Sequence, residues 1–276
     1  MIALSDVVGV LDRLYDPGWA ASWDAVGLVT GDPEQPVRRV LLAVDPVQVV
    51  IDEAIAWEAD LLVTHHPLLL RGVHGVAATG PKGRAVTALV QAGVALHVAH
   101  TNADVADPGV SDALARVLGI GGVRPLQADP SSADGRRGVG RVGRLDAPNT
   151  LASFAAAVAA ALPRTPAGVR VAGDPDRRVE TVAVCGGAGD DLFDEVRANG
   201  ADVYVTADLR HHPASEALEH GTPALVDCSH WATEWPWLAD AQRLLLAGLG
   251  TGADTVETRV STVVTDPWTT HQRSHS

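Results

Sequence analysis

The chain has 276 residues, 46% of them apolar, and a formal net charge of −13 at pH 7. It is too apolar for a disordered chain and long enough for one large or two ordinary domains, while its negative charge and single lysine oppose direct binding to DNA or RNA. Because no apolar run approaches the roughly 18 residues of a membrane span, and two cysteines are too few for a disulfide framework, we expect a cytoplasmic protein without membrane association.

The N-terminal segment is predicted to be a docked amphipathic helix rather than a signal peptide. Apolar residues recur at helical spacing between Val7 and Leu14, behind Ser5 as a candidate cap. The segment has neither a basic region nor a small-residue cleavage site.

Strand-like and helical segments alternate through most of the chain. Short apolar strands are expected at 39–45, 61–67, 94–100, 139–145, 168–172, 179–185, 202–208, 223–229 and 255–265. Helical spacing is found at 46–60, 83–93, 109–119, 150–162, 190–200, 213–221 and 231–248. This alternation predicts βαβ units, and so an α/β fold with largely parallel, buried sheets.

A stretch rich in Gly, Pro, Ser and Asp, residues 121–138, is the predicted domain boundary. We therefore expect two α/β lobes, 1–126 and 127–276, with residues 226–276 packing back toward the cleft between them. In open α/β sheets, ligands bind at the carboxyl ends of the strands. The histidine-bearing segments of the first lobe end at that edge.

Two adjacent histidines, His65 and His66, close the apolar segment LLVTHHPLLL. Neighbouring strand residues point to opposite faces, and Pro67 favours an extended backbone at His66. Two ions a few ångströms apart could take one ring each more easily than one ion could take both. The tandem favours a dinuclear metal site, and a surface turn with two partly solvated histidines is the alternative.

Two further segments carry candidate ligands. Asp104 follows a predicted strand in a polar turn, where a carboxylate can reach a cation or cap a helix. His230 and Glu234 are four residues apart, so on a helix they project from one face, either as ligands or as solvent-exposed neighbours. Pro236 either kinks that helix or delays its start.

Together these residues supply three imidazoles and two carboxylates at predicted strand-to-helix edges. This donor set suits two Zn, Fe or Mn ions rather than Mg or Ca. Because no cysteine belongs to it, an open hydrolytic site is favoured over a closed structural zinc site. His97 is expected in the core or beside the ligands, not among them.

At these residues the sequence resembles the GTP cyclohydrolase 1 type 2 homologue family (NGG-one-interacting-factor-like proteins), nearly end to end. The similar motifs occur in the family's order: SWDAVGLVTGD (22–32), LLVTHHPLLL (61–70), HTNADVA (100–106), GVGRVG (138–143), VCGGAGDDL (184–192), YVTADLRHH (204–212) and SHWATE (229–234). One departure is Ala207, where relatives often have Gly. Because of this departure, two roles remain for Asp208 and His212. They either form the turn at which a helix starts, or they are polar groups that support the metal ligands.

The resemblance implies a dinuclear metal site in the cleft between two α/β lobes. Carried over position by position, the metal ligands are His65, His66, Asp104, His230 and Glu234. We also expect the two carboxylates, Asp104 and Glu234, to take part in catalysis. Family members commonly form toroidal hexamers, so a homohexamer is expected. Some carry an additional ferredoxin-like domain, for which residues 125–180 leave no room.

The implied function is that of a metal-dependent hydrolase, in which metal-activated water acts on a nucleotide or related small molecule; GTP imidazole-ring opening is the family's name-giving reaction. His100, Asp208 and His212 are candidates for proton transfer. A purine could stack on a tryptophan, and subunit-interface burial is the alternative for Trp23, Trp231, Trp235 and Trp237. The alternative function is that of a metal-binding protein, metallochaperone or scaffold without turnover of its own.

Overall fold

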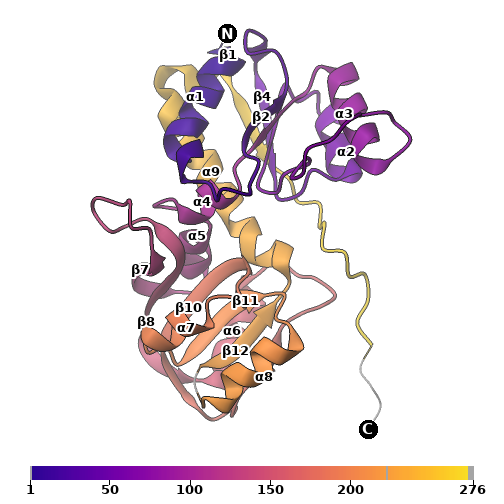
Figure 1. The fold of residues 1–276 in the computed structure, drawn as a ribbon. Coiled ribbons are helices and arrows are strands. Elements are labelled where there is room, and N and C mark those ends of the chain that lie inside the picture. Colours follow the sequence, from indigo (N-terminus) through magenta and orange to yellow (C-terminus); the bar gives the residue numbers. More distant parts are fainter. Residues whose placement is uncertain (1, 222, 273–276) are drawn as a thin grey trace. The chain divides into compact units, whose positions relative to one another are not determined.

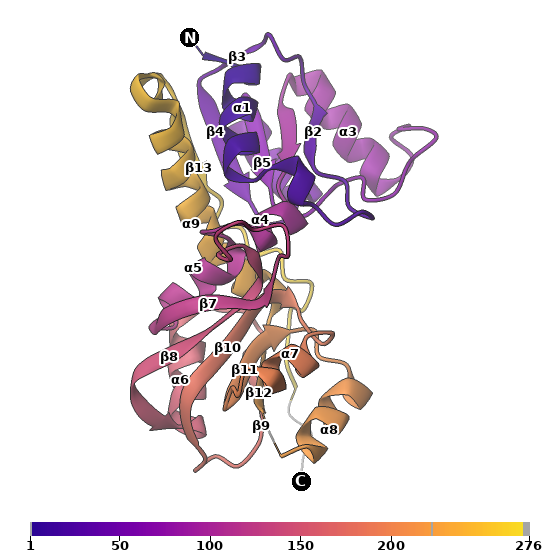
Figure 2. The ribbon, with the colours of Figure 1, turned by 60° about the vertical axis from the view of Figure 1, so that its left-hand side comes forward.

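The computed structural model describes residues 2–221 and 223–272. The chain divides into two compact units, Met1–Ala106 with Leu238–Thr265, and Asp107–Trp237 with Asp266–Ser276. Each unit is built around one larger sheet, of five strands in the first and six in the second (Figures 1 and 2). Among the described residues, no helix is long and apolar enough to cross a membrane.

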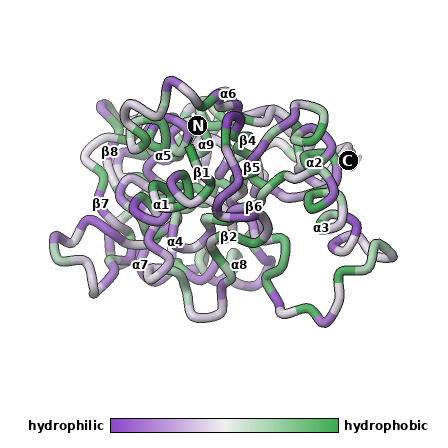
Figure 3. The backbone as a smooth tube through the Cα atoms, turned by 90° about the horizontal axis from the view of Figure 1, so that it is seen from above, coloured by the Kyte–Doolittle hydropathy of each residue, from purple (hydrophilic) through white to green (hydrophobic). Residues whose placement is uncertain are grey.

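The sheet of the first unit has the strand order β13-β4-β5-β6-β2. Its strands are β2 (Gly27–Thr30), β4 (Arg39–Ala43), β5 (Leu61–Thr64), β6 (Ala95–Val98) and β13 (Glu257–Val260), beside a short antiparallel pair of β1 (Ile2–Ala3) and β3 (Pro36–Val37). All neighbours are parallel except β2, which runs antiparallel to β6. The inner strands β5 and β6 are buried throughout, and β4 and β5 are correspondingly hydrophobic in Figure 3.

Helices cover both faces of this sheet. They are α1 (Leu4–Leu14), α2 (Gln48–Ala56), α3 (Pro81–Ala92), α4 (Thr101–Val105) and the later part of α9 (His230–Leu249), with the 3-10 turns η1 (Pro17–Trp19) and η2 (Gly250–Thr255). On one face, Leu41 and Leu62 of the sheet share a core with Ile51 of α2 and Leu89 of α3. On the other, α1 lies beside α9 (Figure 1). A glycine is needed there, because a Cβ at Gly248 would meet a methyl of α1 at 2.4 Å.

The sheet of the second unit has the order β7-β8-β10-β11-β12-β9. Its strands are β7 (Ile120–Ala128), β8 (Gly138–Thr150), β9 (Arg170–Ala172), β10 (Arg178–Ala188), β11 (Val203–Ala207) and β12 (Ala224–Cys228). Only β10, β11 and β12 are parallel to one another; the other three pairings are antiparallel. The expectation of a largely parallel sheet is therefore wrong here, because β7 and β8 form a hairpin and β9 returns along β12.

The helices of the second unit are α5 (Val110–Val117), α6 (Leu151–Ala161), α7 (Phe193–Ala198), α8 (His211–Glu219) and the start of α9. The alanine-rich stretch is a helix, as predicted, and its apolar residues Leu151, Phe154 and Val158 are buried. Thr150 begins it by accepting a hydrogen bond from the Ser153 amide.

The boundary between the units differs from the one expected from composition. Residues 121–138 contain most of β7, and they belong to the second unit because β7 pairs with β8. Residues 238–265 belong to the first unit, where β13 pairs in parallel with β4. Of the predicted strand 255–265, only Glu257–Val260 is a strand.

Two local predictions also need revision, and one of the two alternatives for Pro236, a late helix start, is excluded. The helix α1 begins after Ala3 and contains Ser5, so Ser5 is not its cap. Asp104 lies in the short helix α4 rather than in an open turn. The helix α9 begins at His230 and continues through Pro236. The helix end at Gly93 is confirmed, since this residue has the left-handed φ of 69° that favours glycine.

Candidate metal centre

In the first unit, parallel strands end together and carry the histidines to one edge. The backbone pairing of β5 continues beyond the strand: the His65 amide donates to Ala43 O at 3.2 Å and the His66 amide to Val44 O at 2.9 Å. The Ala99 amide donates to Thr64 O at 3.0 Å, which aligns the end of β6 with that of β5. His65, His66 and His100 therefore follow neighbouring strand ends.

These three histidines form a compact cluster. One nitrogen of each ring lies within 4.8 Å of the corresponding nitrogens of the other two. Nε2 of His65 also lies 3.6 Å from Oδ1 of Asp104. His65 is fully buried, whereas His66 and His100 are partly accessible. The cluster thus presents several donor atoms to one small volume at the strand ends.

Each ring is oriented through its Nδ1 atom. His65 Nδ1 lies 2.9 Å from Ala99 O, His66 Nδ1 lies 2.7 Å from Asp45 Oδ1, and His100 Nδ1 lies 2.9 Å from Asp24 Oδ1. A carbonyl or carboxylate oxygen can only accept, so Nδ1 carries the proton and the lone pair resides on Nε2. This is the tautomer that a histidine ligand to a metal adopts.

The carboxylate of Asp24 fixes the position of His100. It also accepts hydrogen bonds from the amide and the hydroxyl of Thr101, at 3.1 and 2.5 Å. Burial raises the pKa of Asp24, but the hydrogen bonds from Thr101 and His100 outweigh this and bring the pKa below its usual value. Burial, followed by the neighbouring His65, lowers the pKa of His100, which favours the neutral imidazole needed for a ligand or proton acceptor.

The second unit carries its own pair of candidate ligands at the carboxyl ends of β11 and β12. Nε2 of His230 lies 2.9 Å from Oε1 of Glu234, one helical turn later, and Glu234 is only 3% exposed. Nδ1 of His230 lies 2.7 Å from Oδ2 of Asp208, and this hydrogen bond holds the pKa of Asp208 below its usual value. Because both ring nitrogens face carboxylates, the arrangement favours a cation at Nε2, either a proton or a metal ion.

Gly187, in the segment CGGAG, leaves space against this pair. Its φ is +71°, and a Cβ would lie 2.5 Å from Oε1 of Glu234 and 3.1 Å from Nε2 of His230. The Gly187 amide donates to the hydroxyl of Thr233 at 2.9 Å, which holds β10 against α9. A side chain at this position would therefore occupy the space in front of the two ligand atoms.

Within each unit, the structure brings candidate ligands into contact: His65, His66 and Asp104 in the first, His230 and Glu234 in the second. It adds His100 to the first group, where its nitrogen is as close as those of the two predicted ligands. Asp45 was not singled out from the sequence, although it ends a strand predicted to neighbour that of His65. Its place at the same carboxyl edge is the signal that could have found it.

Other residues considered from the sequence are not among the candidate ligands. His97 is buried, with its Nε2 3.4 Å from Oδ1 of Asp12 on α1, which agrees with a core position. His212 contacts the ring of His211 on α8. Trp231 and Trp237 are buried, whereas Trp23 is 61% exposed and its ring centroid lies 6.0 Å from that of His100. Trp23 is thus an exposed aromatic surface beside the histidine cluster.

Comparisons with known proteins cover nearly the whole chain. The model of the family Duf34/NIF3 (NGG1p interacting factor 3) matches residues 2–267. A Streptomyces coelicolor protein named GTP cyclohydrolase 1 type 2 homolog is 57% identical over 275 residues, covering 99% of this chain and 96% of its own. A Mycobacterium tuberculosis protein of the same name is 36% identical, with 97% of each chain covered. That alignment extends over 371 residues, so the mycobacterial relative carries residues that this chain of 276 lacks.

Solved structures agree with the fold. The crystal structure of a Staphylococcus aureus hypothetical protein has a TM-score of 0.88 and 28% identity, covering 96% of this chain and 98% of that one. A Bacillus cereus protein related to NIF3 has a TM-score of 0.89 at 24% identity, covering 97% and 98%, and supports the fold alone. Because the family model and these relatives span nearly the whole chain, this protein belongs to the Duf34/NIF3 family, whose relatives above are named GTP cyclohydrolase 1 type 2 homologs.

Proposed function

We propose that the chain is a metal-dependent hydrolase with a dinuclear metal centre. The proposed ligands are His65, His66, Asp104, His230 and Glu234. The observation that carries the proposal is the orientation of the three clustered histidines, whose Nδ1 atoms all face acceptors while one nitrogen of each ring lies within 4.8 Å of the others. Imidazole and carboxylate donors without cysteine suit Zn, Fe or Mn in an open site.

When bound, two such ions lower the pKa of water to near neutrality and polarise the bond to be broken. The residues of the chain have three roles around the two ions. Asp45 and Asp208 hold the rings of His66 and His230 in position. Asp104 and Glu234 contribute negative charge, and we assign them a part in catalysis. His100, neutral because of its lowered pKa, accepts a proton at Nε2 and is kept in place by Asp24.

The substrate class proposed is a nucleotide or a related small molecule with a planar ring. Trp23 supports this, because an exposed indole beside the histidine cluster offers a stacking surface for a base. Opening of the GTP imidazole ring at C8 is the first reaction to test. We also propose that the protein is cytoplasmic and that it assembles into a homohexamer. Native mass spectrometry tests the hexamer.

The decisive experiment combines metal analysis with turnover. Protein purified without a tag is expected to contain about two ions of Zn, Fe or Mn per chain and to turn over one member of a nucleotide and metabolite panel. His65→Ala is expected to lose metal and to lower turnover about 100-fold or more. His74→Ala is the matched control, since His74 is exposed in the same unit and has no hydrogen bond to any described side chain.

Three outcomes count for an alternative to the hydrolase or against its metal centre. If the wild-type protein binds metal but turns over nothing, and passes the metal to an acceptor, the metallochaperone alternative replaces it. If a metal-free variant keeps its binding to protein partners, the scaffold alternative gains support. Equal metal content in His65→Ala and wild type would remove the proposed centre itself.

A further inference from the structure

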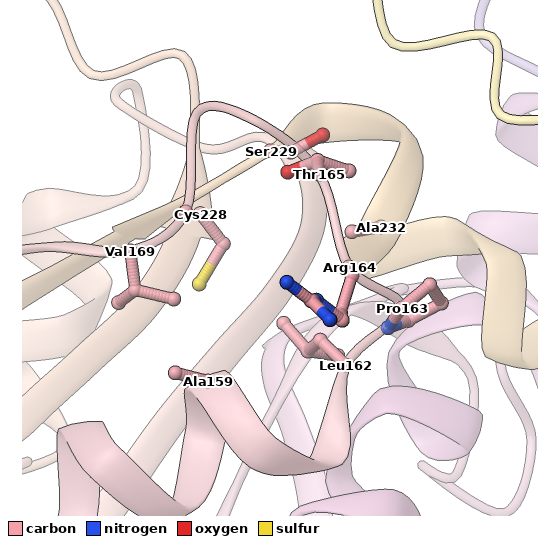
Figure 4. Close-up of a pocket in the computed structure, with 10 residues that line it drawn as sticks. Ala159, Leu162, Pro163, Arg164, Thr165, Val169, Cys228, Ser229 and Ala232 are labelled. Carbon is pink, nitrogen blue, oxygen red and sulfur yellow. The ribbon is translucent and has the colours of Figure 1, made fainter. Parts of the chain in front are cut away.

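The second unit contains a cavity of about 200 Å³ that includes none of the proposed metal ligands (Figure 4). It lies between the loop that joins α6 to β9 and the junction of β12 with α9. Its walls include Leu162, Arg164, Thr165, Val169, Ser229 and Ala232. The walls are largely apolar, with a few polar groups gathered in one small space, as in pockets for small molecules.

Arg164 supplies an unneutralised positive charge to this cavity. Figure 4 shows its guanidinium group within the ring of lining residues. Among residues 2–221 and 223–272, no hydrogen bond or ion pair is formed by this guanidinium. The nearby carboxylate of Asp227 is neutralised by its own ion pair with Arg170. Arg164 therefore has donors for an anion that enters the cavity.

Ser229 supplies a buried hydroxyl. The residue is 6% exposed, and its Oγ has no hydrogen-bond partner in the described part of the chain. Ser229 immediately precedes α9, a helix of 20 residues, and Ala232 of the first helical turn also lines the cavity. The first amides of a helix have no acceptors within the helix and carry its partial positive charge. An unpaired buried hydroxyl and a helix N-terminus thus border the same space.

The remaining polar groups do not oppose an anion. The hydroxyl of Thr165 lies with that of Ser229 at the upper end of the cavity in Figure 4. No carboxylate belongs to the lining.

We infer that this cavity binds the phosphate group of a small phosphorylated compound. A guanidinium, two hydroxyls and first-turn amides are more donors than a carboxylate can engage, whereas a phosphate has three or more acceptor oxygens. The volume is too small for a nucleotide and suits a phosphate with a few carbon atoms against Leu162 and Val169. None of the proposed metal ligands lines the cavity, and the inference does not depend on the hydrolase proposal.

The test is calorimetric titration of the metal-free full-length protein with inorganic phosphate. We expect saturable binding that weakens about tenfold or more in Arg164→Gln and in Ser229→Ala. Arg164 is exposed, so Arg164→Gln does not endanger folding, and circular dichroism checks both variants. Arg84→Gln, at an exposed arginine of the first unit without a side-chain partner among the described residues, is the matched control and is expected to bind as wild type.

A second variant separates this cavity from phosphate binding at the histidine cluster. His66→Ala is expected to keep phosphate affinity if the cavity is the binding site. Loss of binding in His66→Ala with retention in Arg164→Gln would overturn the inference, as would the absence of saturable binding by the wild type. Tighter binding of acetate than of phosphate would overturn the phosphate assignment.

Discussion

Nδ1 of His66 lies 2.7 Å from Oδ1 of Asp45, a residue that follows the neighbouring strand β4. The same carboxylate accepts a hydrogen bond from the hydroxyl of Thr265, close to the C-terminal end of the first unit. Three segments that are distant in the sequence therefore determine where one imidazole points.

Asp45→Asn tests the importance of this contact. We expect a metal affinity lower by about 10- to 100-fold, the usual effect of removing a group that supports a ligand. An amide orients the imidazole ring less strongly than a carboxylate and makes the ring less basic. Competition with a chromogenic chelator measures the metal affinity. The control is Asp52→Asn, an exposed position on α2 where, within the described residues, the carboxylate accepts only from Gln48. Equal loss in both variants would show that net charge, not ring orientation, is responsible.

Gly187→Ala tests the space in front of Glu234. The left-handed φ costs about 1–2 kcal/mol for alanine, and the Cβ would also lie 2.5 Å from Glu234 Oε1. Gly200→Ala has nearly the same φ, +67°, with nothing within 4 Å of its Cβ, and is the matched control for strain alone. We expect Gly187→Ala to lose more unfolding free energy than Gly200→Ala in urea titrations, and to lose metal affinity as well. If the two variants had similar unfolding free energies and metal affinities, the pair of His230 and Glu234 would tolerate the methyl group.

Arg141→Ala tests a buried ion pair. Arg141 is 2% exposed and contacts Asp112 through Nε at 2.8 Å, while also donating to Gly138 O and Gly140 O. Its removal deprives the Asp112 carboxylate of its ion-pair partner, so we expect a decrease of about 3–5 kcal/mol in the free energy of unfolding. The pair of Arg178 and Glu180, whose arginine is exposed, is the comparison, and Arg178→Ala is expected to cost much less than Arg141→Ala.

The raised pKa of the Cys228 thiol predicts how its reactivity depends on pH. Burial, followed by the nearby Asp227, raises its pKa from the ordinary 9.0 to about 12. A raised pKa in the folded state stabilises the fold below pH 9.0, and this contribution is lost as the pH rises toward 12. Alkylation of Cys228, followed by peptide mass spectrometry, is therefore expected to accelerate without a plateau up to about pH 10. A native plateau near pH 9, like that of the urea-unfolded chain, would contradict the raised pKa.

The alternation of strands and helices was predictable from the sequence because it depends on local patterns. Apolar runs such as 39–43 and 61–64 indicate buried strands, and Gly93 marks a helix end by its backbone freedom alone. The hairpin strand β7 was missed because its glycines and proline are typical of a linker. Whether β9 runs parallel or antiparallel to β12 leaves no signature in the strand itself, since both arrangements bury the same residues.

The sequence by itself determined the candidate ligands and their motifs, His65–His66, Asp104 and the turn-spaced His230 and Glu234, because donor chemistry and helical spacing are properties of short segments. Only the tertiary structure decided which carboxylates hold the rings: Asp45 for His66, Asp24 for His100 and Asp208 for His230. The physical reason is that these contacts depend on which strands become neighbours and in which register, and pairing of that kind is fixed by the packing of each whole unit.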